Sequence, residues 1–393
     1  MSAGGYSSRM SAGGDSSRMS AGGDSPRMSG RLSVTYHLKS DAASIEARAR
    51  GIAVEQSVEM PLEAIGDPII LSDIVGMVEA IQPIGDGTFS VRVGLALDTI
   101  GDDAGQLMNM LYGNTSLQND VVLHDVELPP SLIAALGGPQ HGIASLRQRL
   151  GVHGRAFTGS ALKPQGMSIE QLAGLAERFA LGGLDFIKDD HGLADQNYSR
   201  SAERIPACAE AVARAVRMTG HPTRYIPSLS GDLDQMRAQL RQARDAGLDC
   251  AMLAPMIAGF ATLRALSREF PDFTLFAHPA LGGAARIAPE LLIGKLFRLF
   301  GAGGLIFPNY GGRFGYSAET CGRLADNARD TEPAMKASLP IPAGGMTLSR
   351  TGEILDFYGP DTMLLIGGNL LMARDRITEE ASVFARAVAA HAY

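Results

Sequence analysis

Tryptophan is absent from the 393-residue chain, and cysteine occurs only three times. The cysteines, Cys208, Cys250 and Cys321, are odd in number and far apart, which excludes a disulfide framework and the paired spacing of a zinc site. They are typical of free thiols in a reducing cytoplasm, where we expect the protein to reside. No run of about 18 apolar residues occurs, so the sequence predicts no membrane-spanning helix.

An excess of positive charge is also missing. The formal net charge is −7, which argues against a nucleic-acid-binding protein, because such proteins normally carry a basic domain or stripe. Hydrophobic residues make up 45% of the chain and charged residues 20%, a balance that supports a full globular core and excludes a wholly disordered protein. At about 100–200 residues per domain, the length allows two or three domains.

Large apolar side chains are nearly absent from the first thirty residues. Residues 1–27 form three nine-residue repeats, MSAGGYSSR, MSAGGDSSR and MSAGGDSPR. This composition cannot bury enough surface to offset the entropy of ordering, so we predict a disordered low-complexity segment at 1–30. Every repeat begins with methionine, so the sequence leaves open which methionine is the translation start.

Residues 31–135 mix strand and helix patterns and predict a small α+β domain. Leu32–Lys39 alternates apolar and polar side chains, as a strand with one buried face does. Ile74–Ile81 and Thr88–Leu95 flank the turn residues 85–87 (GDG), which predicts a hairpin. A further strand is expected at Val121–Leu128, with helices at Asp41–Ala53 and Asp103–Leu111.

From residue 150 to the C-terminus, after a helical connector, short apolar runs alternate with amphipathic stretches. Eight such units in about 235 residues are typical of a (β/α)8 TIM barrel, which we predict for residues 150–393. An open doubly wound sheet would also alternate, but it usually has fewer units, and no Gly-x-Gly-x-x-Gly turn follows the first strand. The expected strands are Ala156–Leu162, Leu184–Lys188, Arg224–Leu229, Cys250–Ala254, Thr274–His278, Leu305–Pro308, Ser338–Pro342 and Met363–Ile366. The expected helices are Ser168–Leu181, Ala202–Arg217, Asp232–Ala246, Ala258–Glu269, Pro289–Phe300, Ser317–Asn327, Ser349–Phe357 and Leu370–Ala389.

Lysine is scarce, with five residues among the 35 Lys and Arg, yet two of the five follow adjacent strands of the predicted barrel. Catalytic groups of TIM barrels lie at these C-terminal strand ends. A desolvated lysine changes its protonation state readily, whereas arginine does not. Lys163 and Lys188 therefore suggest proton transfer, a Schiff base or a carbamate, against the plainer reading that two surface lysines fall there by chance.

Lys188 and Asp190 are two residues apart, so a strand projects both to the same side. If Lys188 added CO2, its carbamate and Asp190 would offer hard oxygen ligands suited to Mg²⁺. His191 would be an unusual third ligand, because hard cations prefer oxygen. The pairs Gly344-Gly345 and Gly367-Gly368 follow the seventh and eighth strands, which is the usual phosphate site of TIM barrels.

Two segments resemble the large subunit of ribulose-bisphosphate carboxylase (RuBisCO). Residues 159–166 (GSALKPQG) are similar to the Lys-Pro-Lys segment of that family, and residues 182–191 (GGLDFIKDDH) to its Lys-Asp-Asp-Glu carbamylation motif. The resemblance extends from about residue 31 to the C-terminus and is strongest to form IV, the RuBisCO-like proteins that do not fix CO2. It implies a small α+β domain before a TIM barrel, and a homodimer or larger assembly with sites at the subunit interface.

The resemblance also implies roles for individual residues. Lys163 matches the catalytic base, Lys188 the carbamylated lysine, and Asp190 a ligand of the Mg²⁺ cofactor. His191 stands where the family has glutamate. The matched substrate-binding positions are Asn109, which reaches the site from the partner subunit, His278, Gly344, Gly345, Gly367 and Gly368.

The departures from the carboxylase pattern point to a different reaction. Gln165 replaces the second lysine of Lys-Pro-Lys, and the loop after the sixth strand has no lysine to orient CO2. The triplet Gly294-Lys295-Leu296 only mimics that loop motif, because it falls in the fifth predicted helix of the barrel. Pro279 and Pro308 replace two residues that bind the second phosphate, a loss for which Arg286 or Arg313 would have to compensate. We therefore expect a substrate with one phosphate.

A base, a magnesium site and one phosphate site suit the enolisation of a phosphorylated ketose. The first hypothesis is an isomerase of 5-methylthioribulose 1-phosphate, in methionine salvage, in which a proton is abstracted and Mg²⁺ stabilises the enediolate. The alternatives within the family are a 3-oxo-isoapionate 4-phosphate decarboxylase and a 2,3-diketo-5-methylthiopentyl-1-phosphate enolase. A Schiff-base aldolase and a non-catalytic binding protein stay open as rivals from other classes.

Overall fold

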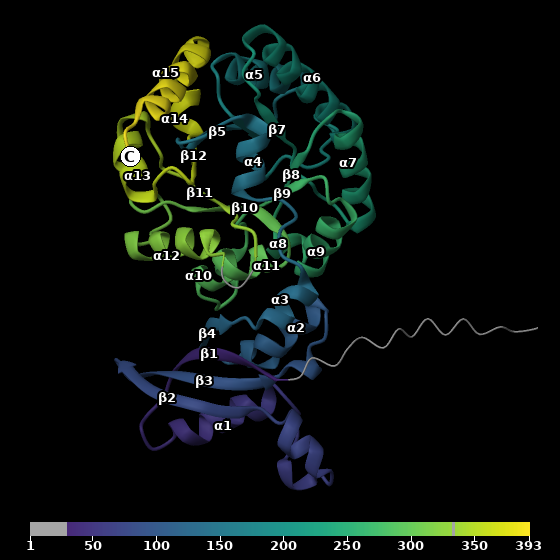
Figure 1. Ribbon diagram of the computed structural model, residues 1–393, viewed down its shortest axis with the longest axis vertical. Helices are drawn as coiled ribbons and strands as arrows, with labels where there is room; N and C mark the ends of the chain where they lie inside the picture. The colour runs from purple at the N-terminus through teal and green to yellow at the C-terminus, as the bar shows by residue number, and fades with distance from the viewer. Residues whose placement is uncertain (1–29, 332–334) are drawn as a thin grey trace, which may run out of the picture.

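The computed structural model describes residues 30–331 and 335–393. The segment 1–30, predicted to be a disordered repeat, lies outside the described residues except for Gly30. Figure 1 shows a small domain with a four-stranded sheet below a larger eight-stranded barrel surrounded by helices. The predicted α/β architecture is confirmed. No helix of the described residues is both long and apolar enough to cross a membrane.

The small domain is built on an antiparallel sheet with the order β2-β3-β1-β4. The predicted alternation of β1 holds, since Leu32, Val34, Tyr36 and Leu38 are all buried. The predicted hairpin is also present, with positive φ angles of 49° at Asp86 and 64° at Gly87. The elements are β1 (Arg31–Lys39), α1 (Ile45–Glu55), β2 (Met77–Gly85), β3 (Thr88–Ala96), α2 (Ala104–Tyr112) and β4 (Val121–Glu127).

Most of the segment between α1 and β2 carries no sequence prediction, and the strand expected from Ile74 begins only at Met77. The segment forms a 3₁₀ turn at Leu62–Ala64 and a π-helical turn at Ile70–Ile74. Several large apolar side chains are exposed along it, and Ile69 is 64% exposed. The others are Met60, Leu62, Ile70, Leu71 and Met77.

The eight barrel strands lie where the sequence predicts them, with ends that differ by up to three residues. All neighbouring strands are parallel, and a bridge between Ser228 and Met252 joins β7 to β8 and closes the barrel. The Leu229 N–H also donates to the Met252 carbonyl at 2.7 Å. The strands are β5 (Phe157–Leu162), β6 (Phe186–Asp189), β7 (Arg224–Ile226), β8 (Cys250–Leu253), β9 (Thr274–Ala277), β10 (Ala302–Pro308), β11 (Leu339–Ala343) and β12 (Met363–Leu365).

The helices around the barrel follow the predicted ranges, with three interruptions. A capping box starts α5, because Ser168 accepts from the Gln171 N–H and the Gln171 side chain accepts from the Ser168 N–H. The predicted helix 258–269 is broken at Gly259. The predicted helix 289–300 contains a π-helical turn at Leu292–Leu296. The predicted helix 370–389 is split into α14 and α15. The helices are α5 (Ile169–Leu181), α6 (Ser201–Thr219), α7 (Leu233–Asp245), α8 (Pro255–Ala258), α9 (Phe260–Glu269), α10 (Pro289–Leu291), α11 (Phe297–Leu299), α12 (Ala318–Arg329), α13 (Thr351–Tyr358), α14 (Gly368–Leu371) and α15 (Ile377–Ala390).

The barrel interior is a packed apolar core. Phe157, Phe186, Ile226 and Phe276 are almost fully buried there, and α4 (Ile143–Leu150) packs against the same cluster. The remaining connector helix is α3 (Pro130–Leu136). A filled barrel leaves only its ends for chemistry, as in other barrels of this kind.

Charged and backbone contacts of β4 join the small domain to the barrel. The Lys295 Nζ donates to Asp125 Oδ1 at 2.6 Å, which gives a structural role to the lysine that mimics the carboxylase loop. Backbone hydrogen bonds link Leu123 to Arg286 and Ala288, each at 2.9 Å. The Arg286 guanidinium also donates to the Gln118 carbonyl at 3.0 Å. Arg286 is thus engaged at the domain junction rather than free to hold a second phosphate.

Candidate active site

The two lysines singled out by the sequence lie on neighbouring strands at one end of the barrel. In the β5–β6 ladder Ala161 is opposite Lys188, and Lys163 follows the last residue of β5. The strands are parallel, so both lysines lie at the carboxyl end, where barrel enzymes place their chemistry.

Lys188 lies on top of the apolar interior, and only 6% of the residue is exposed. Phe186, Ile226 and Phe276 line the small space beside it. Burial, helped by the Lys163 charge and opposed by the Asp190 charge, lowers the pKa of Lys188 from 10.5 to about 8. A buried amine with this pKa is partly neutral near pH 7, which is the state that reacts with CO2 or with a carbonyl.

Asp190 connects the other polar side chains. Its Oδ1 lies 2.6 Å from the Nζ of Lys163 and 3.4 Å from the Nδ1 of His191. Burial would raise the pKa of Asp190, but hydrogen bonds from His191 and Lys163 and the charges of Lys163 and Lys188 outweigh burial and lower it. Asp190 therefore stays a carboxylate.

His278, after β9, joins the same group. Its ring stacks on that of His191, with centroids 4.2 Å apart and planes 8° from parallel. Burial, then the charges of Lys188 and His191, lower the pKa of His278 to about 2, so this imidazole is neutral at pH 7. The structure thus brings together five predicted site residues: Lys163, Lys188, Asp190, His191 and His278.

The glycine pairs divide into two kinds. Gly344 and Gly345 have positive φ angles of 83° and 73°, and a Cβ added to Gly345 would lie 2.8 Å from the Cα of Gly312. Close packing of the loops after β10 and β11 therefore requires glycine there even without a ligand. Around Gly367 and Gly368 an added Cβ meets no atom within 4 Å, which leaves their backbone accessible. Phosphate binding at both pairs remains a prediction.

Asn109, also predicted to bind substrate, lies in the small domain and not with the lysines of the barrel. It belongs to α2 of the small domain, where its side-chain amide donates to Gln106 at 3.4 Å. In Figure 1, α2 lies outside the barrel. The role of Asn109 toward a second subunit stays a prediction.

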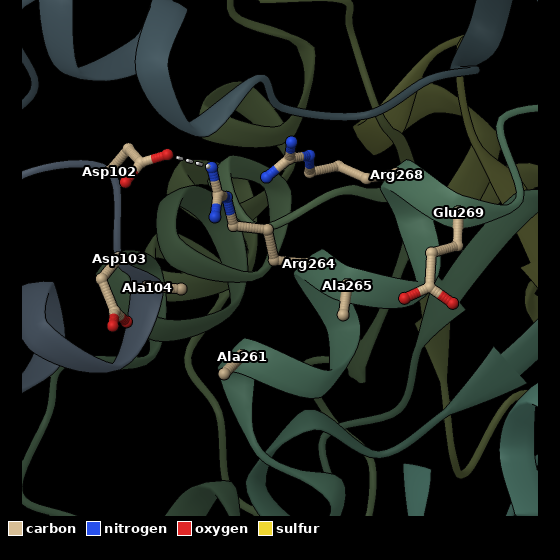
Figure 2. Close-up of a pocket in the computed structure, with 8 residues that line it drawn as sticks. All are labelled: Asp102, Asp103, Ala104, Ala261, Arg264, Ala265, Arg268 and Glu269. Atoms are coloured by element: carbon tan, nitrogen blue, oxygen red, sulfur yellow. Dashed lines mark ion pairs between the residues drawn. The ribbon is translucent and has the colours of Figure 1, made fainter. Parts of the chain in front are cut away.

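A roomy cavity of about 570 Å³ lies between α9 and the residues before α2, away from the lysines. Figure 2 shows the Arg264 guanidinium paired with Asp102, 3.7 Å apart, with Arg268 nearby. Glu269 on its wall is paired with Arg237. None of the predicted site residues lines this cavity, so we attribute it to the domain junction.

The sequence pattern did not reveal one group beside the site. Asp189 has the opposite parity to Lys188 and Asp190, and its carboxylate is fully buried against Arg204 and Tyr225. The only signal in the sequence was that Asp189 alternates with Lys188 and Asp190 along the strand and so faces the other way. Its partner Arg204 lies fifteen residues further along the chain, in α6.

The donor set fits a divalent cation only if Lys188 supplies a ligand. Within residues 30–331 and 335–393, no three His, Cys, Asp or Glu side chains gather as a metal site. Asp190 and His191 lie 3.4 Å apart, and a carbamate on Lys188 would add the oxygen that Mg²⁺ prefers. The lowered pKa of Lys188 favours that modification.

Comparison with known proteins places this site in a family. The sequence profile of the ribulose bisphosphate carboxylase large chain, catalytic domain, matches residues 142–314, which include both lysines and His278. The 5-methylthioribulose-1-phosphate isomerase of Rhodospirillum rubrum is 58% identical over 360 residues, covering 91% of this chain and 96% of that protein. The chain belongs to the RuBisCO large-chain family. Its relatives there include RuBisCO-like proteins, and the predicted resemblance is confirmed.

Two further relatives define its place among the RuBisCO-like proteins. The crystal structure of a RuBisCO-like protein from Rhodopseudomonas palustris is 49% identical, superposes with a TM-score of 0.87 and covers 93% of this chain and 99% of that one. The 2,3-diketo-5-methylthiopentyl-1-phosphate enolase of Geobacillus kaustophilus is 29% identical over 357 residues, covering 85% of this chain and 86% of that protein. Of the relatives described above that are named for a reaction, one is an isomerase and the other an enolase.

Proposed function

We propose that this RuBisCO-like protein isomerises 5-methylthioribulose 1-phosphate by proton transfer next to the carbonyl group. The observation that carries the proposal is the contact between Lys163 and Asp190 at the catalytic end of the barrel, 2.6 Å long and adjacent to the buried Lys188. The 58% identity to a protein named for this reaction supports the choice of substrate.

The two lysines differ in exposure, which suits two different roles. The Lys163 side chain is 35% exposed, so its amine can meet a substrate that enters from the mouth of the barrel. In the proposed reaction Lys163, once it has given up its own proton, takes the proton from the carbon next to the carbonyl, and the enediolate is reprotonated at the former carbonyl carbon. Lys188 is too buried for that task and would instead hold a cofactor.

The cofactor we propose is Mg²⁺, held by Lys188 as its carbamate, by Asp190 and by His191. When bound, the cation would supply positive charge that stabilises the substrate oxygens. His278 is neutral and can donate a hydrogen bond to the substrate, and Gly344, Gly345, Gly367 and Gly368 would hold its single phosphate with backbone N–H groups.

We further propose a homodimer in which Asn109 completes the site of the partner subunit. Two sets of exposed apolar side chains support an assembly. One is the segment from Met60 to Met77, and the other lies on loops at the carboxyl end of the barrel, where Leu281, Phe314 and Met372 are 57%, 56% and 71% exposed. Patches of this kind mark surfaces that are covered in an assembly.

Carboxylation does not fit the chain, because residues 309–317 between β10 and α12 contain no lysine. A 2,3-diketo-5-methylthiopentyl-1-phosphate enolase is the second candidate, supported by the Geobacillus kaustophilus relative. Both reactions begin with the same proton abstraction, so substrate turnover must distinguish them.

The test is proton exchange in D2O, followed by NMR with each substrate, with and without Mg²⁺ and bicarbonate. We expect wild-type protein to exchange and convert the methylthioribulose phosphate, and Lys163→Met to lower the rate by about 10²- to 10⁴-fold. Lys336→Met, which removes an exposed lysine, is the matched control and should retain full activity.

Three outcomes would contradict the proposal. Exchange that survives in Lys163→Met would show that Lys163 is not the base. A borohydride-trapped covalent adduct with substrate would indicate a Schiff-base aldolase instead. Absence of exchange with every candidate ketose phosphate would indicate a binding protein.

A further inference from the structure

Asp189 lies between two site residues but faces the other way. Alternation along β6 sends its side chain out of the barrel, toward α6 and β7. Its Oδ1 accepts from the Tyr225 hydroxyl at 2.7 Å, and its Oδ2 accepts from the Ser228 N–H at 3.1 Å and from the Arg204 Nε at 3.2 Å. Asp189 therefore fastens the end of β6 to the end of β7 and to α6.

Arg204 extends this network to the loop after His191. Its Nη1 donates to the carbonyls of Ala194 and Ser199, at 2.8 and 2.7 Å. One guanidinium thus holds both the carboxylate of Asp189 and the chain that follows the site residues. The main chain of Asp189 takes part too, since its carbonyl accepts from the Lys188 Nζ at 2.8 Å.

The burial of this pair is unusual for an ion pair. Among ion pairs of residues 30–331 and 335–393, Arg204–Asp189 is the one in which neither side chain has exposed surface. Removing two charges from water costs so much that apolar replacements of buried pairs are often equally or more stable. Stability alone therefore does not account for the pair, whereas a demand for fixed geometry at the strand end does.

We propose that Asp189 and Arg204 are positioning residues that keep residues 188–191, at the end of β6, in a fixed place relative to Lys163. The inference rests on the proposed function, because it assigns the pair a purpose in that reaction. The pair touches neither substrate nor cofactor. It acts through the backbone of β6, whose displacement would move Lys188 and Asp190 together.

The chain offers a matched control at the opposite end of the same strand. Asp185, directly before β6, is fully buried and accepts two hydrogen bonds from Arg155, at 2.7 and 2.8 Å. A single substitution in either pair would leave a buried charge without its partner and could unfold the protein. The comparison therefore uses two double variants, Asp189→Asn/Arg204→Met and Asp185→Asn/Arg155→Met.

Both variants are first shown to be folded by circular dichroism at the assay temperature. We expect the Asp189/Arg204 variant to lose about 100-fold in kcat, the effect of a displacement near 1 Å, with KM within about threefold of wild type. Its crystal structure should show the Lys163 Nζ–Asp190 Oδ1 distance increased from 2.6 Å. The Asp185/Arg155 variant should keep both kcat and this distance.

The proposal is overturned if both folded variants keep the wild-type distance, or if their activities fall equally. An inactive wild type would refute the proposed function instead, and the distances in the two crystal structures would still decide the positioning role.

Discussion

Burial of Lys188 makes a quantitative prediction about its reaction with CO2. With a pKa of about 8 in place of 10.5, the neutral fraction at pH 7 rises from roughly 0.03% to roughly 9%, a factor of about 300. Since only the neutral amine adds CO2, the rate of carbamate formation at fixed dissolved CO2 should follow this fraction and reach half its maximum near pH 8. An unperturbed lysine would reach it near pH 10.4.

The assay is ¹³C NMR of the protein in ¹³C-labelled CO2 and bicarbonate between pH 6 and 9. The chain has five lysines, so few carbamate resonances compete. The carbamate resonance that forms fastest should be absent in Lys188→Met and present in Lys336→Met. A rate that still rises about tenfold between pH 8 and pH 9, as an unperturbed lysine requires, or a resonance that survives in Lys188→Met, would refute the reasoning from burial.

The same pKa fixes the sign of a stability effect. Between pH 8 and 10.5 the unfolded chain binds more protons at Lys188 than the folded protein does, so the free energy of unfolding should rise with pH. The shift of about 2.5 pKa units bounds this contribution at about 3 kcal/mol, as an order of magnitude. In CO2-free buffer, the free energy of unfolding from chemical denaturation should have a more positive pH slope in wild type than in Lys188→Met, and equal slopes would contradict it.

Four other substitutions test the loop packing, a helix cap and the domain junction. Gly345→Ala should slow turnover and lower the melting temperature, because an added Cβ would lie 2.8 Å from the Cα of Gly312. Gly367→Ala has open space around the added Cβ and should keep the wild-type melting temperature. Equal melting temperatures of the two variants would contradict this reasoning. Ser168→Ala removes a helix cap and should cost about 1 kcal/mol in urea denaturation, with activity unchanged in the folded protein; no loss would show that the cap is dispensable. Lys295→Met breaks the ion pair to the small domain and should speed proteolysis at the domain junction, and an unchanged cleavage rate would argue against that link.

The barrel and the location of most candidate site residues at one of its ends can be predicted from the sequence alone. The eight apolar runs predict the eight strands because strands of a filled barrel need short apolar segments on a regular spacing. The strand ends then place Lys163, Lys188 and His278 at one end without any coordinates. The residues 182–191 carried the family resemblance.

The tertiary structure decided what depends on distant residues meeting. The lowered pKa of Lys188 follows from Phe186, Ile226 and Phe276 around it, which come from three strands. The network of Asp189 and Arg204 and the docking role of Lys295 are likewise contacts between separate elements. Periodicity reports which face of an element is buried, but only packing reports which partner buries it.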